Sequence, residues 1–150
     1  MYLILIMVLV SIDQLTKLLI YNSLGVFQSI PIIDNVFHIT YVKNFGAAFN
    51  IFQGKTNFLI VITIAIIIGA IIYLILKHKV LQPMIKVSMS LIISGGIGNI
   101  IDRCRVGFVV DFLDFRHFPV FNFADICVTT GCALLIIHMI LSERWQKNEH

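Results

Sequence analysis

Residues 58–76 form an uninterrupted run of nineteen residues without a charge. About 20 apolar residues in a helix span the hydrocarbon core of a bilayer, so this run predicts a membrane-spanning helix. The composition agrees, because 59% of the 150 residues are hydrophobic and only 13% are charged, whereas soluble domains carry about 25% charged residues. We therefore expect an integral membrane protein with one domain over residues 1–150.

Three further segments have the length and hydropathy of spans, at residues 2–21, 84–101 and 121–142. The first lacks the basic start and the cleavage site of a signal peptide, so we interpret it as a retained helix. The segment at 84–101 carries several glycines, which allow helices to approach closely, and we expect them to serve packing. The predicted fold class is an all-α polytopic membrane protein with four transmembrane helices.

Residues 22–57 are too polar to cross a membrane. Side chains alternate in polarity over residues 36–43, which predicts a strand, and Asn44-Phe45-Gly46 predicts a turn. More than thirty residues is long for an idle connection. We therefore predict a small β-rich element on one membrane face.

Charge and cysteine usage exclude several classes of function. The net charge is only +3 and no basic cluster is present, which gives no indication of nucleic-acid binding. The three cysteines show no metal-binding spacing, so we expect no disulfide framework, metal or cofactor. Four spans place both termini on one side, where five of the eleven Lys and Arg residues fall, against six on the other. Charge alone therefore does not orient the protein.

Acidic residues concentrate on one side of this topology. The helices at 84–101 and 121–142 are joined by a short loop, so acids at their ends and in that loop converge on one membrane boundary. Asp102, at the first of these ends, can pair with a neighbouring arginine or bond a backbone group. Six of the eight acidic residues belong to this side: Asp13, Asp34, Asp102, Asp111, Asp114 and Asp125.

Structural roles account for some of these acids. Asp13 and Lys17 are four residues apart and share a helix face, where they can pair. We expect Asp114 to be solvated in its loop. Asp111 has only apolar neighbours and Asp125 has no cation within four residues. Because acids at membrane depth are costly, these two are functional candidates.

Two carboxyl groups brought close together share one proton, because like charges in a low dielectric cannot both ionise. The ionised member then activates water, and the protonated member polarises a carbonyl and protonates the leaving amine. Paired aspartates also suit a proton-coupled membrane transporter. A Mg²⁺-dependent lipid-headgroup enzyme using Asp102, Asp111, Asp114 and Asp125, or a non-enzymatic scaffold, are further alternatives.

Five short motifs together resemble those of the lipoprotein signal peptidase (signal peptidase II) family. Each motif is weak alone, but five in this order on a four-span chain form a specific pattern. They are DQLTK at 13–17, NFGAAF at 44–49, GNIIDR at 98–103, GFVVDF at 107–112 and FNFAD at 121–125.

The resemblance implies an intramembrane aspartyl endopeptidase with Asp111 and Asp125 as its catalytic dyad. Its substrates would be diacylglyceryl-modified prolipoproteins, cleaved before the lipidated cysteine. The protein would act in the bacterial cytoplasmic membrane among membrane lipids, with cytoplasmic termini, an extracytoplasmic β-rich element and an outward-facing site, and we expect a monomer. Asp102 and Arg103 would pair with each other or brace the loop. The supporting and substrate-binding positions would be Asp13, Lys17, Asn44, Gly46, Asn99, Asp102, Arg103, Asn122 and Ala124.

Overall fold

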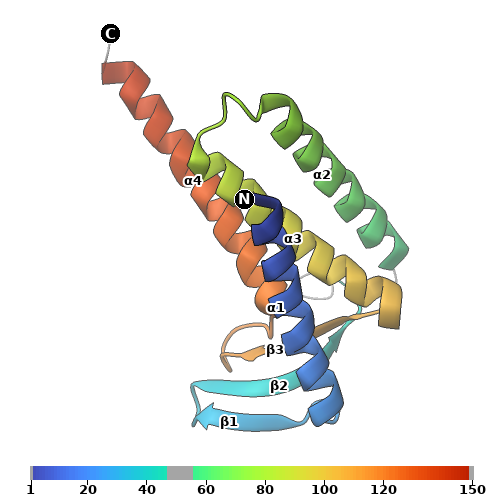
Figure 1. The fold of residues 1–150 in the computed structure, drawn as a ribbon. Coiled ribbons are helices and arrows are strands. Elements are labelled where there is room, and N and C mark those ends of the chain that lie inside the picture. The colour runs from blue at the N-terminus through green and yellow to red at the C-terminus, as the bar shows by residue number, and fades with distance from the viewer. Residues whose placement is uncertain (1, 47–55, 149–150) are drawn as a thin grey trace.

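The computed structural model describes residues 2–46 and 56–148, with side chains as far as residue 142. Its described residues contain four helices that are long and apolar enough to cross a membrane. These are α1 (Tyr2–Ser23), α2 (Thr56–Lys77), α3 (Pro83–Val106) and α4 (Phe123–Asn148). A three-stranded antiparallel sheet lies at one end of the bundle, away from both termini (Figure 1). Its strands are β1 (Ser29–Ile33), β2 (Phe37–Asn44) and β3 (Val109–Asp114).

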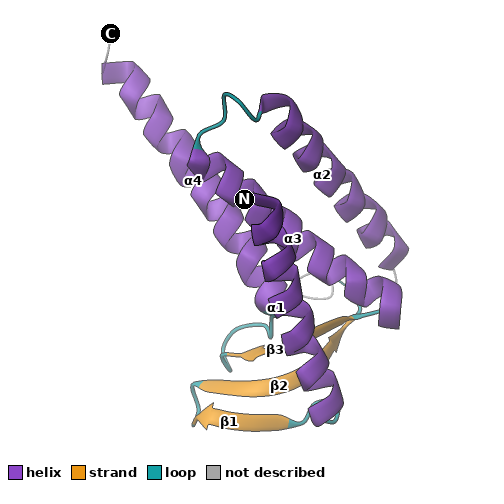
Figure 2. Ribbon diagram, in the orientation of Figure 1, coloured by secondary structure: helices purple, strands orange, loops and turns teal. Residues whose placement is uncertain are grey.

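This architecture confirms the predicted class of four spanning helices with a small β-rich element (Figure 2). The boundaries of α3 follow from its end residues. Pro83 stands at the first helical positions, where no backbone N–H is needed. Gly107 ends the helix with φ of 81°, a left-handed conformation that glycine adopts without strain, and its N–H donates to the Arg103 carbonyl at 3.1 Å.

Three glycines let α3 stand at the centre of the bundle, in contact with each of the other helices. A methyl group on Gly95 would overlap a backbone carbonyl of α4. On Gly96 it would lie 2.9 Å from Ile67 of α2, and on Gly98 it would overlap the carboxylate of Asp13 on α1. The expectation that these glycines serve close packing is confirmed.

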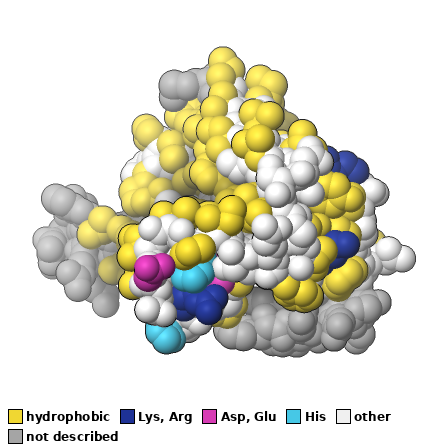
Figure 3. All heavy atoms as spheres, turned by 90° about the horizontal axis from the view of Figure 1, so that it is seen from below, with side chains coloured by type: hydrophobic (Ala, Val, Ile, Leu, Met, Phe, Trp, Pro, Cys, Tyr) yellow, Lys and Arg dark blue, Asp and Glu magenta, His cyan; other side chains and the backbone are white. Residues whose placement is uncertain are grey.

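The sheet is anchored beneath α1. β2 is the predicted strand, shifted by one residue from 36–43, and it pairs antiparallel with both β1 and β3. Its Tyr41 is buried in a core cluster with Leu24, Phe108 and Val110. Seen from the sheet end, a small group of charged and histidine side chains lies at one edge of the face, and hydrophobic side chains cover much of the rest (Figure 3).

Two expectations for the connection between α3 and α4 were wrong. Asp111 and Asp114 lie in strand β3, not in a loop, because the apolar run around Asp111 pairs with β2 and is buried. Asp114 is also not solvated: it is 6% exposed and accepts hydrogen bonds from Thr40 Oγ1 at 2.7 Å and Arg116 Nη1 at 3.2 Å. Burial alone would raise the pKa of Asp114, but the bonds from Thr40 and Arg116 hold it below its ordinary value.

Candidate active site

Asp111 projects from β3 into a set of amide side chains. It is 2% exposed. Its Oδ2 accepts from Asn44 Nδ2 at 2.9 Å and its Oδ1 from Asn122 Nδ2 at 2.6 Å. Burial raises the pKa of Asp111 to about 7, the nearby charge of Asp125 adds to the rise, and the two amide bonds oppose it. At neutral pH this acid is therefore able to hold or release a proton.

Asp125 stands in the first turn of α4, where the preceding Asn122 caps the helix. The Asp125 N–H donates to Asn122 Oδ1 at 3.0 Å, and the Asn122 N–H donates to Asp125 Oδ2 at 3.1 Å. This reciprocal pair satisfies two backbone donors at the helix start. The second oxygen, Oδ1, accepts from Asn99 Nδ2 of α3 at 2.9 Å. Helix capping and the Asn99 amide thus fix the orientation of the Asp125 carboxylate.

Both acids line one cavity of about 710 Å³, walled by α2, α3, α4 and the segment before α4. Its polar atoms come chiefly from the end nearest the sheet, where Asn44, Asn99 and Arg103 join the two acids, and its remaining walls are mostly apolar. A cavity of this kind suits a ligand with a polar backbone and apolar substituents.

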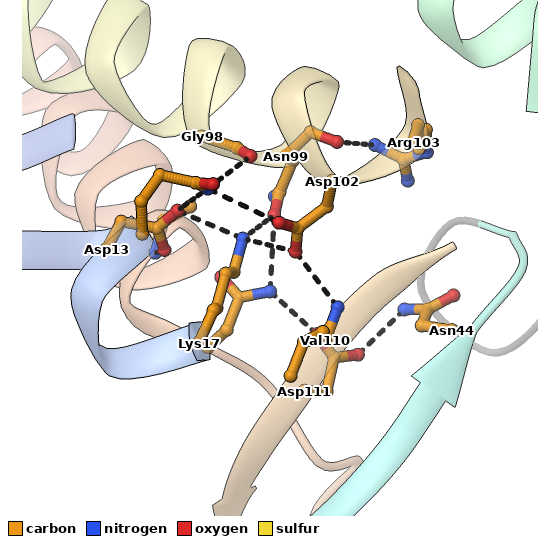
Figure 4. A network of polar contacts seen from close by, with 12 residues as sticks. Asp13, Lys17, Asn44, Gly98, Asn99, Asp102, Arg103, Val110 and Asp111 are labelled. Carbon is orange, nitrogen blue, oxygen red and sulfur yellow. Dashed lines mark hydrogen bonds and ion pairs between the residues drawn. The ribbon is translucent and has the colours of Figure 1, made fainter. Parts of the chain in front are cut away.

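A second group of acids lies beside this pair and surrounds Lys17 (Figure 4). Lys17 Nζ lies 3.0 Å from Asp13 Oδ2 and 3.2 Å from Asp102 Oδ2, and all three side chains are buried. Gln14 Nε2 donates to Asp13 at 3.1 Å and to Asp102 at 3.3 Å. The predicted Asp13–Lys17 pair is confirmed, and the cluster joins α1 to α3.

The alternatives expected for Asp102 are met in part. It does not pair with Arg103, but it accepts from the Val110 backbone N–H at 3.0 Å, and Arg105 Nη2 lies 4.0 Å from its Oδ1. Asp102 turns toward Lys17, whereas Arg103 points away from it and donates to the Gly46 carbonyl at 3.0 Å and to the Asn99 carbonyl at 3.4 Å (Figure 4). Successive residues on a helix diverge by about 100°, so the two side chains leave α3 in different directions. Arg103 thereby braces the turn at Gly46. Residues 47–49 of the same motif lie outside the described residues.

Sequence reasoning missed two contributors to this site. Gln14 was not singled out, although an uncharged polar side chain next to Asp13 in a span is a signal that polar contacts surround it. The Val110 backbone N–H, which donates to Asp102 Oδ2 at 3.0 Å, leaves no trace in side-chain patterns. Ala124 likewise acts through its N–H, which donates to Asp13 Oδ1 at 2.9 Å.

The Mg²⁺ alternative requires four acids to gather around one ion. Asp102 is engaged with Lys17 and Asp114 with Arg116, so they are not free to join Asp111 and Asp125. Over residues 2–46 and 56–148, no three His, Cys, Asp or Glu side chains are placed to hold a metal ion. Of the four acids, only Asp111 and Asp125 therefore line the cavity together.

Four spans and an amide-bound carboxyl pair at the sheet end of the bundle, of which Asp111 is buried, define a polytopic membrane protein with a polar site near one end of its helices. Residues 5–141 match the family model described as signal peptidase (SPase) II. The chain belongs to this family, and it is thus a multi-pass bacterial membrane peptidase.

Individual relatives agree over nearly the full length. The chain is 45% identical over 146 residues to the lipoprotein signal peptidase of Halothermothrix orenii, covering 97% of this chain and 96% of the relative. It is 43% identical over 145 residues to that of Clostridioides difficile, covering 95% and 97%. A bacterial membrane enzyme solved at 2.3 Å superposes with a TM-score of 0.89 at 35% identity, covering 95% of this chain and 88% of that one.

Proposed function

We propose that this peptidase removes signal peptides from diacylglyceryl-modified prolipoproteins, cleaving before the lipidated cysteine with an Asp111/Asp125 dyad. The observation that carries the proposal is that both acids line one cavity and receive side-chain hydrogen bonds only from neutral amides among the described residues. Without a paired cation, two nearby carboxyls retain one proton between them at neutral pH. The names of the relatives support the same substrate class.

The two acids divide the chemistry between them. Asp125 is held as an acceptor by Asn99 and by the start of α4, so it takes a proton from the attacking water. Asp111, whose pKa is raised to about 7, carries the shared proton, polarises the scissile carbonyl and then protonates the leaving amine. The dyad then holds its single proton on Asp125, and this proton passes to Asp111 after the products leave, which restores the starting state.

The cavity supports this substrate class. Its apolar walls between α2, α3 and α4 suit a signal helix and acyl chains, and the amides of Asn44 and Asn99 suit a peptide backbone. Arg103 Nε is buried and has no hydrogen-bond partner among the described residues, so we assign it to an oxygen of the peptide or of a lipid headgroup. A scissile bond between a signal helix and lipid chains would be held at the depth of the dyad.

We assign the sheet and the dyad to the outer face of the cytoplasmic membrane, with both termini cytoplasmic. Membership of the family implies this orientation, which the balance of charged residues does not decide. A cysteine-scanning label that cannot cross the membrane tests the assignment, because Cys104 is exposed near the sheet end. Labelling of Cys104 in intact cells supports it, and protection of Cys104 until the membrane is opened contradicts it.

Purified wild type, Asp111→Asn and Asp125→Asn test the mechanism on a lipidated prolipoprotein, with and without EDTA. We expect the wild type to cleave in EDTA and both variants to lose cleavage while remaining folded. Asp114→Asn is the matched control, because it changes a buried acid of the same strand outside the cavity. Near wild-type cleavage by either dyad variant would disprove the dyad, and an inert wild type would contradict the proposed lipidated substrate.

A further inference from the structure

Each acid of the proposed dyad directly follows a residue whose backbone N–H is held by another carboxylate. The Val110 N–H, just before Asp111, donates to Asp102 Oδ2 at 3.0 Å. The Ala124 N–H, just before Asp125, donates to an acid of α1 at 2.9 Å. Val110 and Ala124 are both 0% exposed, so water does not compete for these bonds.

A single lysine joins the two carboxylates that hold these backbone groups. Lys17 Nζ lies 3.0 Å from Asp13 Oδ2 and 3.2 Å from Asp102 Oδ2. The same ammonium donates to Asn99 Oδ1 at 2.8 Å, and the Asn99 amide donates to Asp125. Lys17 also fixes the orientation of this amide, because the oxygen of Asn99 must face the cation and its nitrogen must then face Asp125.

We infer that Asp13, Lys17 and Asp102 act as one positioning unit, which sets the distance between the two dyad carboxyls and the direction in which each points. The inference rests on the proposed function, because it assumes that Asp111 and Asp125 carry the chemistry. None of the three positioning residues lines the cavity. They act through the backbone before each acid and, for Asp125, also through Asn99.

Other contacts do not replace this unit. Backbone bonds between Leu113 and Phe121 join β3 to the segment before α4. They hold the two acid-bearing segments to each other. Asn122 Nδ2 also joins them to α3, because it donates to Asn99 Oδ1 at 3.2 Å and to Asp111 Oδ1 at 2.6 Å, but none of these bonds reaches the Val110 or Ala124 N–H. The positioning unit spans α1 and α3 and reaches both segments. An ion pair that only held α1 to α3 would need neither backbone N–H.

The consequence for catalysis is geometric. A displacement of about 1 Å at reacting groups can lower a rate by roughly 100-fold. Loss of the Asp102 carboxylate removes the hydrogen bond that holds β3 to α3 at Val110, and it leaves the buried Val110 N–H without a partner. We therefore expect Asp102→Ala to lower kcat about 100-fold with KM within roughly threefold of wild type.

Asp102→Asn separates position from charge. Its side-chain oxygen can still accept from Val110 and Lys17, while Gln14 can turn its own oxygen toward the new amide nitrogen. We expect Asp102→Asn to restore kcat to within about tenfold of wild type. Asp114→Ala is the control, since it removes a buried carboxylate from β3, the strand of Val110 and Asp111, without touching the unit, and we expect its kcat to stay within roughly threefold.

The experiment measures kcat and KM on a lipidated prolipoprotein in detergent, with circular dichroism to verify folding. A folded Asp102→Ala with wild-type kcat overturns the inference, and so does a tenfold or larger rise in KM at unchanged kcat. If Asp102→Ala does not fold, Asp102→Asn decides, because a kcat below a hundredth of wild type in a folded Asp102→Asn also overturns it. Asp111→Asn and Asp125→Asn run in parallel, and only their retained activity would contradict the dyad itself.

Discussion

Two pairs of aspartates lie side by side at the sheet end of this bundle, and they differ in the partners of their carboxyl groups and in their access to the cavity. Asp13 and Asp102 share the cation Lys17, which lies within 3.2 Å of an oxygen of each. Asp111 and Asp125 receive side-chain hydrogen bonds from asparagines only, among the described residues. The first pair is bound in an ion cluster outside the cavity, and the second lies within it.

Under the proposed mechanism, one residue type serves two purposes at one end of the bundle. A carboxylate beside a buried cation has its oxygens occupied and holds helices together. A carboxyl pair beside neutral donors is oriented equally well, but it keeps a proton to exchange. Removing the cation from the first pair should therefore lower the free energy of unfolding. Adding a cation to the second pair should remove its proton and slow cleavage.

The largest effect is expected when Asp13 and Asp102 lose their shared cation. Lys17→Met leaves two buried carboxylates without a counter-charge, and breaking a buried ion pair from one side costs about 3–5 kcal/mol in the free energy of unfolding. Denaturant unfolding in a detergent micelle measures it. Lys43→Met is the control. Among the described residues the Lys43 ammonium makes only a cation–π contact with Phe108, so this substitution should change the free energy of unfolding by under about 1 kcal/mol. Equal stability of the two variants would contradict the structural role of Lys17.

The next largest effect is expected when the dyad gains a cation. Asn44→Lys places an ammonium beside Asp111, which should lower the pKa of Asp111 by about 1–3 units and slow cleavage at pH 7 by roughly 5- to 500-fold. Asn44→Met removes the same amide without adding charge, so the pKa of Asp111 should instead rise, because that amide bond lowers it. The basic limb of the pH–rate profile, near pH 7 in wild type, should move to lower pH in one variant and to higher pH in the other. If the basic limb moved in the same direction in both variants, the charge of the neighbouring side chain would not be what controls the pKa of Asp111.

A smaller effect is expected where Asp13 of α1 packs against Gly98 of α3. A methyl group at Gly98 would overlap the carboxylate of Asp13, so Gly98→Ala should cost about 1–3 kcal/mol by overpacking. Gly69→Ala on α2 is the matched control, since nothing lies within 4 Å of the added methyl group, and it should be neutral or stabilising by up to about 1 kcal/mol. Thermal unfolding of both variants measures the difference. Similar melting temperatures would mean that α1 and α3 are not in close contact at Gly98.

The sequence predicted those features that follow from hydropathy and from short-range patterns. The spans, the strand at β2 and the pairing of Asp13 with Lys17 were all predicted, because each depends on residues close together in the chain. The stretch at β3 was mistaken for a loop. Its strand forms only against β2, about seventy residues earlier in the chain, and two acids interrupt its apolar pattern.

Polar contacts between distant segments were the part that could not be predicted. The ion pair of Asp102 with Lys17 depends on the packing of α1 against α3, so the sequence indicated only a neighbouring arginine or a backbone group as partners of Asp102. The bonds from Val110 and Ala124 are made by backbone groups, which are the same for any residue except proline. Asp111 and Asp125 were singled out from the sequence because their neighbours offer no structural role, and their assignment as a catalytic dyad was implied by the motif resemblance.

The smallest effect concerns Asp114, a third kind of aspartate, which is stabilised by one hydroxyl and one exposed cation. Thr40→Val removes the O–H that donates to Asp114 at 2.7 Å, and we expect a loss of about 1–2 kcal/mol at pH 7. The pKa of Asp114 lies below its ordinary value of 3.8 in the folded protein, so its ionised form contributes stability above about pH 4. That contribution disappears as the pH falls through the lowered pKa. The difference in unfolding free energy between wild type and Thr40→Val should therefore shrink as the pH falls through this lowered pKa. A difference that stayed constant with pH would mean that Thr40 acts through packing, and a loss of cleavage at pH 7 would place Asp114 with the dyad after all.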